Sequence, residues 1–135
     1  MEQNQQLEQA KVALGQAIDE VRGINAHDLT FLGSLVTPQP AVAEVTGAIA
    51  TLIGEGDGGW QETKRSFLNP KNYIDKIVAL KASDVPENTL KAAIQEYEGK
   101  PENFGEDLKK KSSAAGVLGG WLVAFVKVAA LEKTA

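Results

Sequence analysis

The residues with the most chemical potential in this sequence are a pair of glycines and a single histidine. Gly54 and Gly59 have the spacing of the glycines in a phosphate-binding P-loop. Trp60 and Gln61 follow them, where that motif needs lysine and then serine or threonine, so we expect no nucleotide site. His27 is the only histidine and the chain has no cysteine. It therefore lacks the partners that a metal site or a nucleophile–base pair requires.

The carboxylates offer no better site. Asp57 is alone in the glycine-rich loop, whereas calcium requires several oxygen ligands. Neighbouring acids such as Asp19 and Glu20 would point about 100° apart on a helix, which is typical of solvated charges. The sequence therefore predicts a segment that is not an enzyme, with no catalytic residue, no metal ion and no cofactor.

The composition is that of one small globular domain. The chain has 135 residues, of which 43% are hydrophobic and 24% charged, with a formal net charge of −4. The negative charge argues against a nucleic-acid binder, and the absence of cysteine excludes a disulfide framework. We expect no secretory signal and no membrane span. The N-terminus is polar, and the longest apolar run is interrupted by Lys127 and too short to cross a bilayer.

The charges are segregated along the chain. Residues 1–59 contain two basic and eight acidic residues, whereas residues 60–111 contain ten basic and nine acidic residues. Lys109, Lys110 and Lys111 come at the start of the last predicted helix, where the helix dipole favours acids. Such a run is most often a solvated face, and the alternative is a site for an acidic partner.

Two heptad patterns stand at the two ends of the chain. The first is formed by Leu7, Ala10, Leu14, Ala17, Val21 and Ile24, and the second by Val117, Trp121, Ala124, Val128 and Leu131. Spacings that alternate between three and four residues are those of a coiled-coil seam, which requires a partner helix. We therefore expect the two ends to pair with each other as antiparallel helices.

The helices between the seams are short. We predict helices at about 2–26, 38–53, 60–68, 70–80, 84–98 and 105–133. Three start signals support them: Thr37 before Pro38, Asn69 before Pro70, and Asp84 with Glu87 as a capping box. The expected fold class is all-α, a small bundle of short helices capping a truncated antiparallel coiled-coil stalk. Residues 1–26 and 115–135 would form the stalk, and residues 27–114 the helical cap.

The last predicted helix carries a second apolar row beside its seam. This row consists of Leu118, Leu122, Phe125 and Ala129. A two-stranded coiled coil needs only one apolar row. Packing on the cap explains Leu118 and Leu122 well, but Phe125 and Ala129 are further along the stalk. The outer part of the row therefore indicates an exposed apolar surface for a second protein.

The order and spacing of five segments resemble the microtubule-binding domain at the tip of the dynein heavy-chain stalk. The segments are 28–42 (DLTFLGSLVTPQPAV), 48–54 (AIATLIG), 60–68 (WQETKRSFL), 72–80 (NYIDKIVAL) with 84–86 (DVP), and 113–121 (SAAGVLGGW). The resemblance covers nearly the whole chain and implies a helical bundle capping an antiparallel stalk. In such a domain Pro38 and Pro40 would release the chain from the stalk, so that the next helix lies across the tip.

The resemblance also implies a function and its residues. The segment would be the track-binding tip of an ATP-driven motor, in which the register of the stalk helices is coupled to affinity for tubulin. The partners would be the microtubule and the remainder of the dynein heavy chain. The residues that match the family's microtubule contacts are Val42, Ala43, Thr46, Lys64, Lys71, Lys76 and Lys110.

Departures from the family pattern suggest a particular branch. Cytoplasmic relatives often carry basic residues where this chain has Gly33, Ala43 with Glu44, and Gly120, so weak, salt-sensitive microtubule binding is expected. The chain looks more like an axonemal outer-arm heavy chain of cilia or flagella. The alternative function is a docking platform for a leucine-rich-repeat light chain, through Leu29, Phe31 and Phe125.

Overall fold

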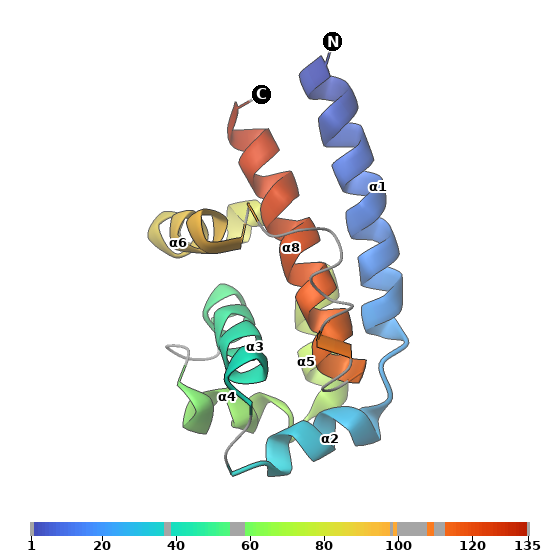
Figure 1. Cartoon of the computed structure of the whole chain (residues 1–135), viewed down its shortest axis with the longest axis vertical. Helices are drawn as coiled ribbons and strands as arrows, with labels where there is room; N and C mark the ends of the chain where they lie inside the picture. The colour runs from blue at the N-terminus through green and yellow to red at the C-terminus, as the bar shows by residue number, and fades with distance from the viewer. Residues whose placement is uncertain are drawn as a thin grey trace.

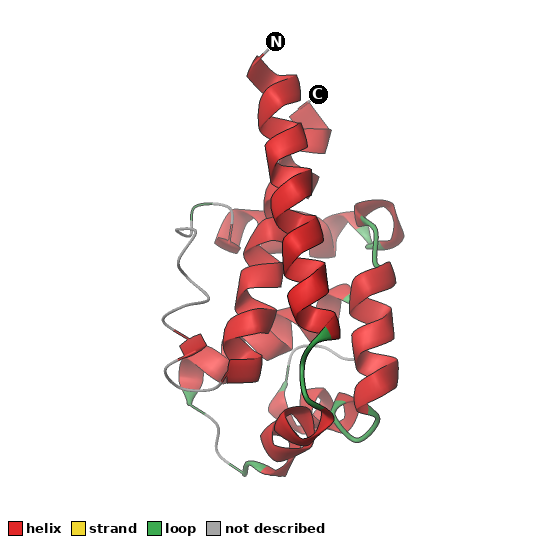
Figure 2. Cartoon of the chain, turned by 90° about the vertical axis from the view of Figure 1, so that its right-hand side faces the viewer, coloured by secondary structure: helices red, strands yellow, loops and turns green. Residues whose placement is uncertain are grey.

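The computed structural model is a helical cap on a pair of long antiparallel helices (Figure 1). It describes residues 2–36, 39–54, 59–97, 99, 108–109 and 113–134, and for residues 2–4 and 133–134 the backbone only. The described residues contain helices and no strand, which confirms the all-α class (Figure 2). The elements are α1 (Glu2–Arg22), α2 (Ala26–Ser34), α3 (Pro40–Leu52), α4 (Trp60–Ser66), α5 (Pro70–Ala79), η1 (Ala82–Asp84), α6 (Glu87–Tyr97) and α8 (Ser113–Thr134).

Helices α1 and α8 form the pair that the seams predict. They run side by side in opposite directions, and both ends of the chain lie at the same end of the molecule (Figure 1). The seam residues Val21 and Trp121 are completely buried, and the seam residues Leu14 and Val117 are half-buried. The antiparallel pairing of the two ends is therefore confirmed.

The first predicted helix ends earlier than expected, and a further helix follows it. α1 ends at Arg22, and the amide of Gly23 donates to the carbonyls of Asp19 and Glu20. α2 then begins at Ala26, because the Asn25 side chain accepts a hydrogen bond of 2.8 Å from the amide of His27. The predicted helix over 2–26 therefore extends four residues too far, and α2 was not predicted because the cap at Asn25 was overlooked.

Two other start signals differ in detail. α3 begins at Pro40 after Gln39, while Thr37 and Pro38 lie outside the described residues. Asp84 does not cap α6: its carboxylate accepts from the amide of Lys81 at 3.2 Å and closes the short helix η1. The expected capping box with Glu87 is therefore wrong, because the nearer 3₁₀ turn uses the carboxylate. Asn69 and Pro70 do open α5 as predicted.

Helix α8 is the centre of the core. Its second apolar row is buried, with Leu118 and Leu122 at 0% exposure and Phe125 at 3%, and the Phe125 ring stacks on Trp121 at 4.9 Å. The row is covered because α3 and α6 pack against α8 in addition to α1 (Figure 1). The expectation of an exposed outer row is therefore wrong.

The same burial explains the apolar character of this helix. Ser113–Glu132 is long and apolar enough by composition to cross a membrane, contrary to the expectation that the run is too short. However, 67% of its most apolar part is buried within the fold. This is the pattern of a core helix in a globular domain, where one helix is surrounded by others.

Candidate functional site

The end of the cap furthest from the chain termini is formed by α2 and α4 (Figure 1). α4 is fixed there by the Trp60 indole, whose N–H donates to the backbone carbonyl of Leu35 at 2.9 Å. Its buried side is Thr63 and Phe67, and the Thr63 hydroxyl donates to the carbonyl of Gly59 at 2.8 Å. These contacts turn the polar face of α4, with Glu62 and Arg65, to the outside.

Helix α5 is held next to α4 by its own cap and by aromatic packing. The Asn69 side chain accepts from the amide of Asn72 at 3.4 Å, and Pro70 occupies the first turn, where its missing N–H costs nothing. The buried Tyr73 ring meets the Phe67 ring edge to face at 5.0 Å. The two helices therefore present their polar residues to a shared space.

Most of the lysines that match the family's microtubule contacts lie on α4 and α5. Lys64 is half-buried in the last turn of α4, Lys71 is exposed in the first turn of α5, and Lys76 is half-buried in its last turn. Lys110 lies outside the described residues, next to the half-buried Lys109. Two adjacent helices thus carry three of the four predicted cations.

The predicted contacts on α3 occupy different environments. Val42 and Thr46 are buried, and the Thr46 hydroxyl donates to the carbonyl of Val42 at 2.8 Å. Ala43 is half-buried and Glu44 is exposed. Val42 and Thr46 therefore pack α3 against the core, and the surface of its first turns includes an acid.

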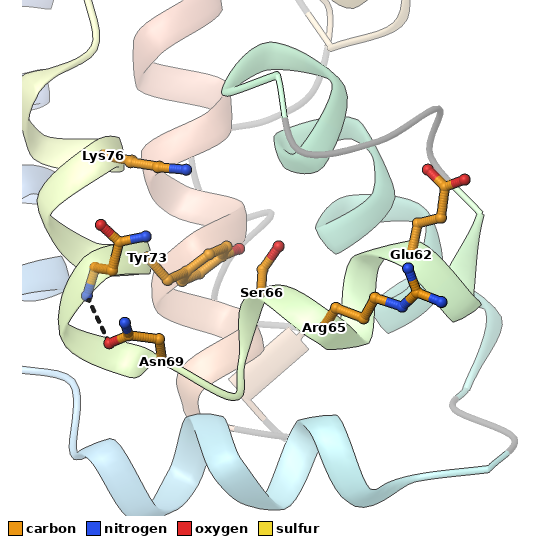
Figure 3. A pocket seen from close by; sticks show the side chains of 7 residues that line it. Glu62, Arg65, Ser66, Asn69, Tyr73 and Lys76 are labelled. Carbon is orange, nitrogen blue, oxygen red and sulfur yellow. Dashed lines mark hydrogen bonds between the residues drawn. The ribbon is translucent and has the colours of Figure 1, made fainter.

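A polar pocket lies between α4 and α5 and was not predicted from the sequence (Figure 3). It has a volume of about 450 Å³. Its walls are Glu62, Arg65, Ser66, Asn69, Asn72, Tyr73 and Lys76. On each side of the helix break at Asn69 these residues recur three or four positions apart, which places them on one face of each helix. This spacing was the sign of the pocket in the sequence.

The residues predicted to bind a light chain do not form one surface. Leu29 is completely buried and Phe125 is 3% exposed, so both belong to the core. Only Phe31 is at the surface, with 65% of its side chain exposed. The prediction of an apolar surface containing all three residues is wrong, because the cap helices cover two of them.

Of the two residues that the sequence analysis considered singly for metal binding or catalysis, the structure places one. His27 is exposed at the start of α2, and Asp57 lies outside the described residues. Within the described ranges no three histidine, cysteine or acidic side chains come together in a group that could hold a metal ion.

The fold is thus an antiparallel helix pair with a helical cap at one end, and three of the predicted lysines lie on two helices of that cap. The family described as "Microtubule-binding stalk of dynein motor" matches residues 2–131. The chain belongs to this family of dynein stalk segments.

Several dynein heavy chains are similar to this chain. The ciliary dynein beta chain of Tripneustes gratilla is 32% identical over 129 residues, which is 92% of this chain. Human dynein axonemal heavy chain 17 is 30% identical over 90% of the chain, and the flagellar outer-arm beta chain of Chlamydomonas reinhardtii is 22% identical over 88%. This chain spans about 3% of the length of these relatives.

Proposed function

We propose that this segment is the microtubule-binding tip of a dynein heavy chain, working in the axoneme of a cilium or flagellum. The family match over residues 2–131 carries the proposal. The names of the ciliary, axonemal and flagellar relatives support the location. ATP hydrolysis would belong to the remainder of the heavy chain, and the tip would change its affinity for tubulin with the register of the stalk helices.

Within this proposal, residues 1–26 and 115–135 act as stalk, and 27–114 as cap. The pairing of α1 with α8, and the start of α2 at Ala26, support these limits. Trp121 and Phe125 lie in the stalk helix and in the cap's core at once. A shift of α8 along α1 would therefore be transmitted to the cap, because close-packed side chains cannot absorb it.

The direct contacts would be electrostatic. We assign them to Lys64, Lys71, Lys76 and Lys110, with Ala43 at the edge and with Val42 and Thr46 setting the position of α3. Tubulin's surface is acidic, so these cations would attract it, while the exposed Glu44 would repel it. Each exposed charge contributes only about 0.2–1 kcal/mol, so binding should be weak and sensitive to salt.

Co-sedimentation with microtubules tests the proposal. Lys71→Glu should weaken binding, because it replaces an attraction at the tip by a repulsion. Lys91→Glu is the matched control: Lys91 is also exposed, but it lies on α6, nearer to the end that holds the termini (Figure 1). Equal losses in the two variants, or binding that salt does not affect, would contradict a tip contact.

A second candidate function rests on Phe31. We propose that the exposed side chains of Phe31, Val36 and Leu68 form a docking surface for a leucine-rich-repeat light chain. They come from α2 and from the segments that follow α2 and α4, two helices in contact with each other. An exposed patch of apolar side chains often marks a protein interface.

The light-chain proposal is tested by a binding assay with that partner. Phe31→Asp should abolish a stoichiometric complex and leave the melting temperature unchanged, because the side chain is at the surface. Val12→Asp is the control, since Val12 is similarly exposed on the stalk helix α1. A complex that survives Phe31→Asp would remove this function.

A further inference from the structure

The polar pocket between α4 and α5 contains the hydroxyl of a serine. Ser66 is the last residue of α4 and is half-buried. Its side chain points into the pocket, with Tyr73 and Lys76 on the α5 side and Arg65 on the α4 side (Figure 3). A group attached to this hydroxyl would enter a cavity of about 450 Å³, which is within the range of about 300–1,000 Å³ that ligand pockets occupy.

Tyr73 gives the pocket a hydrogen-bond donor. Its side chain is 1% exposed and points from α5 toward Ser66 (Figure 3). Its hydroxyl has no hydrogen-bond partner within the described part of the chain. Burial raises the pKa of Tyr73 above its ordinary value, so the hydroxyl keeps its proton and remains a donor. An acceptor attached to Ser66 would satisfy this buried donor, which is otherwise unfavourable to the fold.

The other walls of the pocket suit a phosphate group. A phosphate monoester on serine has three acceptor oxygens and a charge of about −1.5 to −2 at pH 7. Lys76 and Arg65 supply cations from the two helices, and the side-chain amides of Asn69 and Asn72 can donate from the start of α5. The positive end of the α5 dipole lies at the same place. Glu62 is the acid of the lining, and it would oppose the phosphate.

Ser66 lies at the end of a helix that can open locally. α4 has seven residues, and beyond Ser66 the amides of Phe67 and Leu68 donate to the carbonyls of Lys64 and Arg65, both at 3.2 Å. The end of so short a helix opens at a lower free energy than the whole domain unfolds. Opening also has to release the buried Phe67 ring, so we expect modification to be slow. Lys64 and Arg65 directly precede the hydroxyl, which suits a protein kinase with an acidic substrate groove.

We propose that Ser66 is a phosphorylation site, and that Lys76, Arg65 and the hydroxyl of Tyr73 hold its phosphate in the α4–α5 pocket. The reaction forms a bond between Ser66 Oγ and the γ-phosphorus of a nucleoside triphosphate, and breaks the bond from that phosphorus to the bridging oxygen. The nucleoside diphosphate leaves, and a base of the kinase takes the hydroxyl proton. A regulatory consequence rests on the proposed function: the phosphate adds negative charge to the cap, so the phosphorylated tip binds the track less tightly.

The 135-residue chain with phosphoserine incorporated at position 66 tests the proposal without a microtubule. In a phosphorus NMR titration the second phosphate pKa should be lower by about 0.5–1 than that of phosphoserine at position 34, because cations and donors favour the dianion. Ser34 is the matched control, since it is also the last residue of a helix and is exposed. Equal pKa values at the two positions, or loss of the helical signal with phosphoserine at position 66, would overturn the proposal.

Two substitutions in the phosphorylated chain test which side chains hold the phosphate. Tyr73→Phe and Lys76→Gln should each raise the phosphate pKa toward the value at position 34. Tyr73→Phe separates the pocket from a general effect of charge, because it removes a donor and no charge. A phosphate pKa that is insensitive to Tyr73→Phe would mean that the phosphate lies outside the pocket, against the proposal.

The modification itself is tested with ATP and a serine kinase that prefers basic residues before its acceptor. Mass spectrometry should find phosphate at Ser66 in the folded chain, and Ser66→Ala should remove that phosphopeptide. Ser112 and Ser113, which follow three lysines at 109–111, are an internal comparison. Phosphate on these two residues alone would mean that a kinase does not reach Ser66, and the proposal would fail.

Co-sedimentation with microtubules is a separate measurement. Weaker binding with phosphoserine at position 66 than at position 34 would support both the phosphorylation site and the proposed function. A lowered phosphate pKa without any change in co-sedimentation would establish the phosphate site and leave only the proposed function in doubt.

Discussion

Tyr73 shows how one buried polar atom makes stability depend on pH. Burial disfavours the phenolate, so the pKa of Tyr73 is higher in the folded chain than the ordinary value of 10.0 that applies when the chain is unfolded. Tyr73 therefore does not lower the stability of the folded state below pH 10.0. Above that value the unfolded chain loses the proton first, and the free energy of unfolding falls as the pH rises.

Tyr73→Phe should reduce this fall by about 1.4 kcal/mol for each pH unit above the ordinary tyrosine pKa. At neutral pH the variant should be as stable as the parent or slightly more so, because it removes a buried hydroxyl that has no hydrogen-bond partner among the described residues. Denaturant unfolding at a series of pH values measures both effects. Tyr97→Phe is a useful companion, since burial and then the charges of Glu96 and Glu44 raise the pKa of Tyr97. An unchanged pH profile in both variants would contradict the assignment.

At the same scale, sequence patterns identified which residues are apolar but not what covers them. Phe125 lies in a row with helical spacing, and that spacing alone predicts a face of a helix. Which element packs on this face depends on where α6 crosses α8, a tertiary contact between residues far apart in the chain. Phe31 is exposed because its neighbours Leu29 and Leu32 occupy the inner side of α2.

At the scale of elements, the approach of α2 to α4 is set by one glycine. A methyl group added at Gly33 would lie 3.0 Å from the Cβ of Phe67 and 3.3 Å from the carbonyl oxygen of Lys64. These distances are shorter than ordinary van der Waals contact, and the backbone of α4 cannot move without disturbing the indole bond of Trp60. The absence of a basic side chain at position 33 therefore has a packing reason in this chain.

Gly33→Ala should lower the free energy of unfolding by about 1 kcal/mol or more, because overpacking outweighs the gain in helix propensity. Gly15→Ala is the matched control. Gly15 lies within α1, and no atom of the described residues outside its own helix backbone comes near an added methyl group, so the substitution should stabilise the chain by about 0.5–1 kcal/mol. Urea denaturation of the two variants gives opposite signs if α2 and α4 are in contact as described, and the same sign if they are not.

Helix boundaries were predictable where the cap residue was unambiguous. Asn69 with Pro70 marked the start of α5 correctly, since proline fits only the first turn. Helix α2 was not predicted, because the heptad continues through Ile24 and Asn25 was not recognised as the cap of a further helix. The pocket was missed for a related reason: its residues belong to two helices, and their polar faces looked like ordinary solvated surface.

At the scale of the whole molecule, the pairing of the chain's two ends can be tested in solution. Cysteines introduced at the half-buried seam positions Leu14 and Ala124 should be joined within one chain by a short thiol crosslinker, since α1 and α8 run antiparallel. Cysteines at Val12 and Ala124 should not be joined, because Val12 is on the exposed side of α1. Mass spectrometry of the crosslinked chain at low concentration distinguishes the two. Crosslinks found only between separate chains would mean that the seams serve an oligomer.

The position of the two ends has a mechanical consequence. The start of α1 and the end of α8 lie at the same end of the molecule (Figure 1). A force that pulls these two ends apart therefore breaks the contacts between the helices one turn at a time. A force applied between these ends and the opposite tip acts along both helices instead, and loads all the seam contacts together. The fold should therefore resist tension along its long axis far better than separation of its two ends.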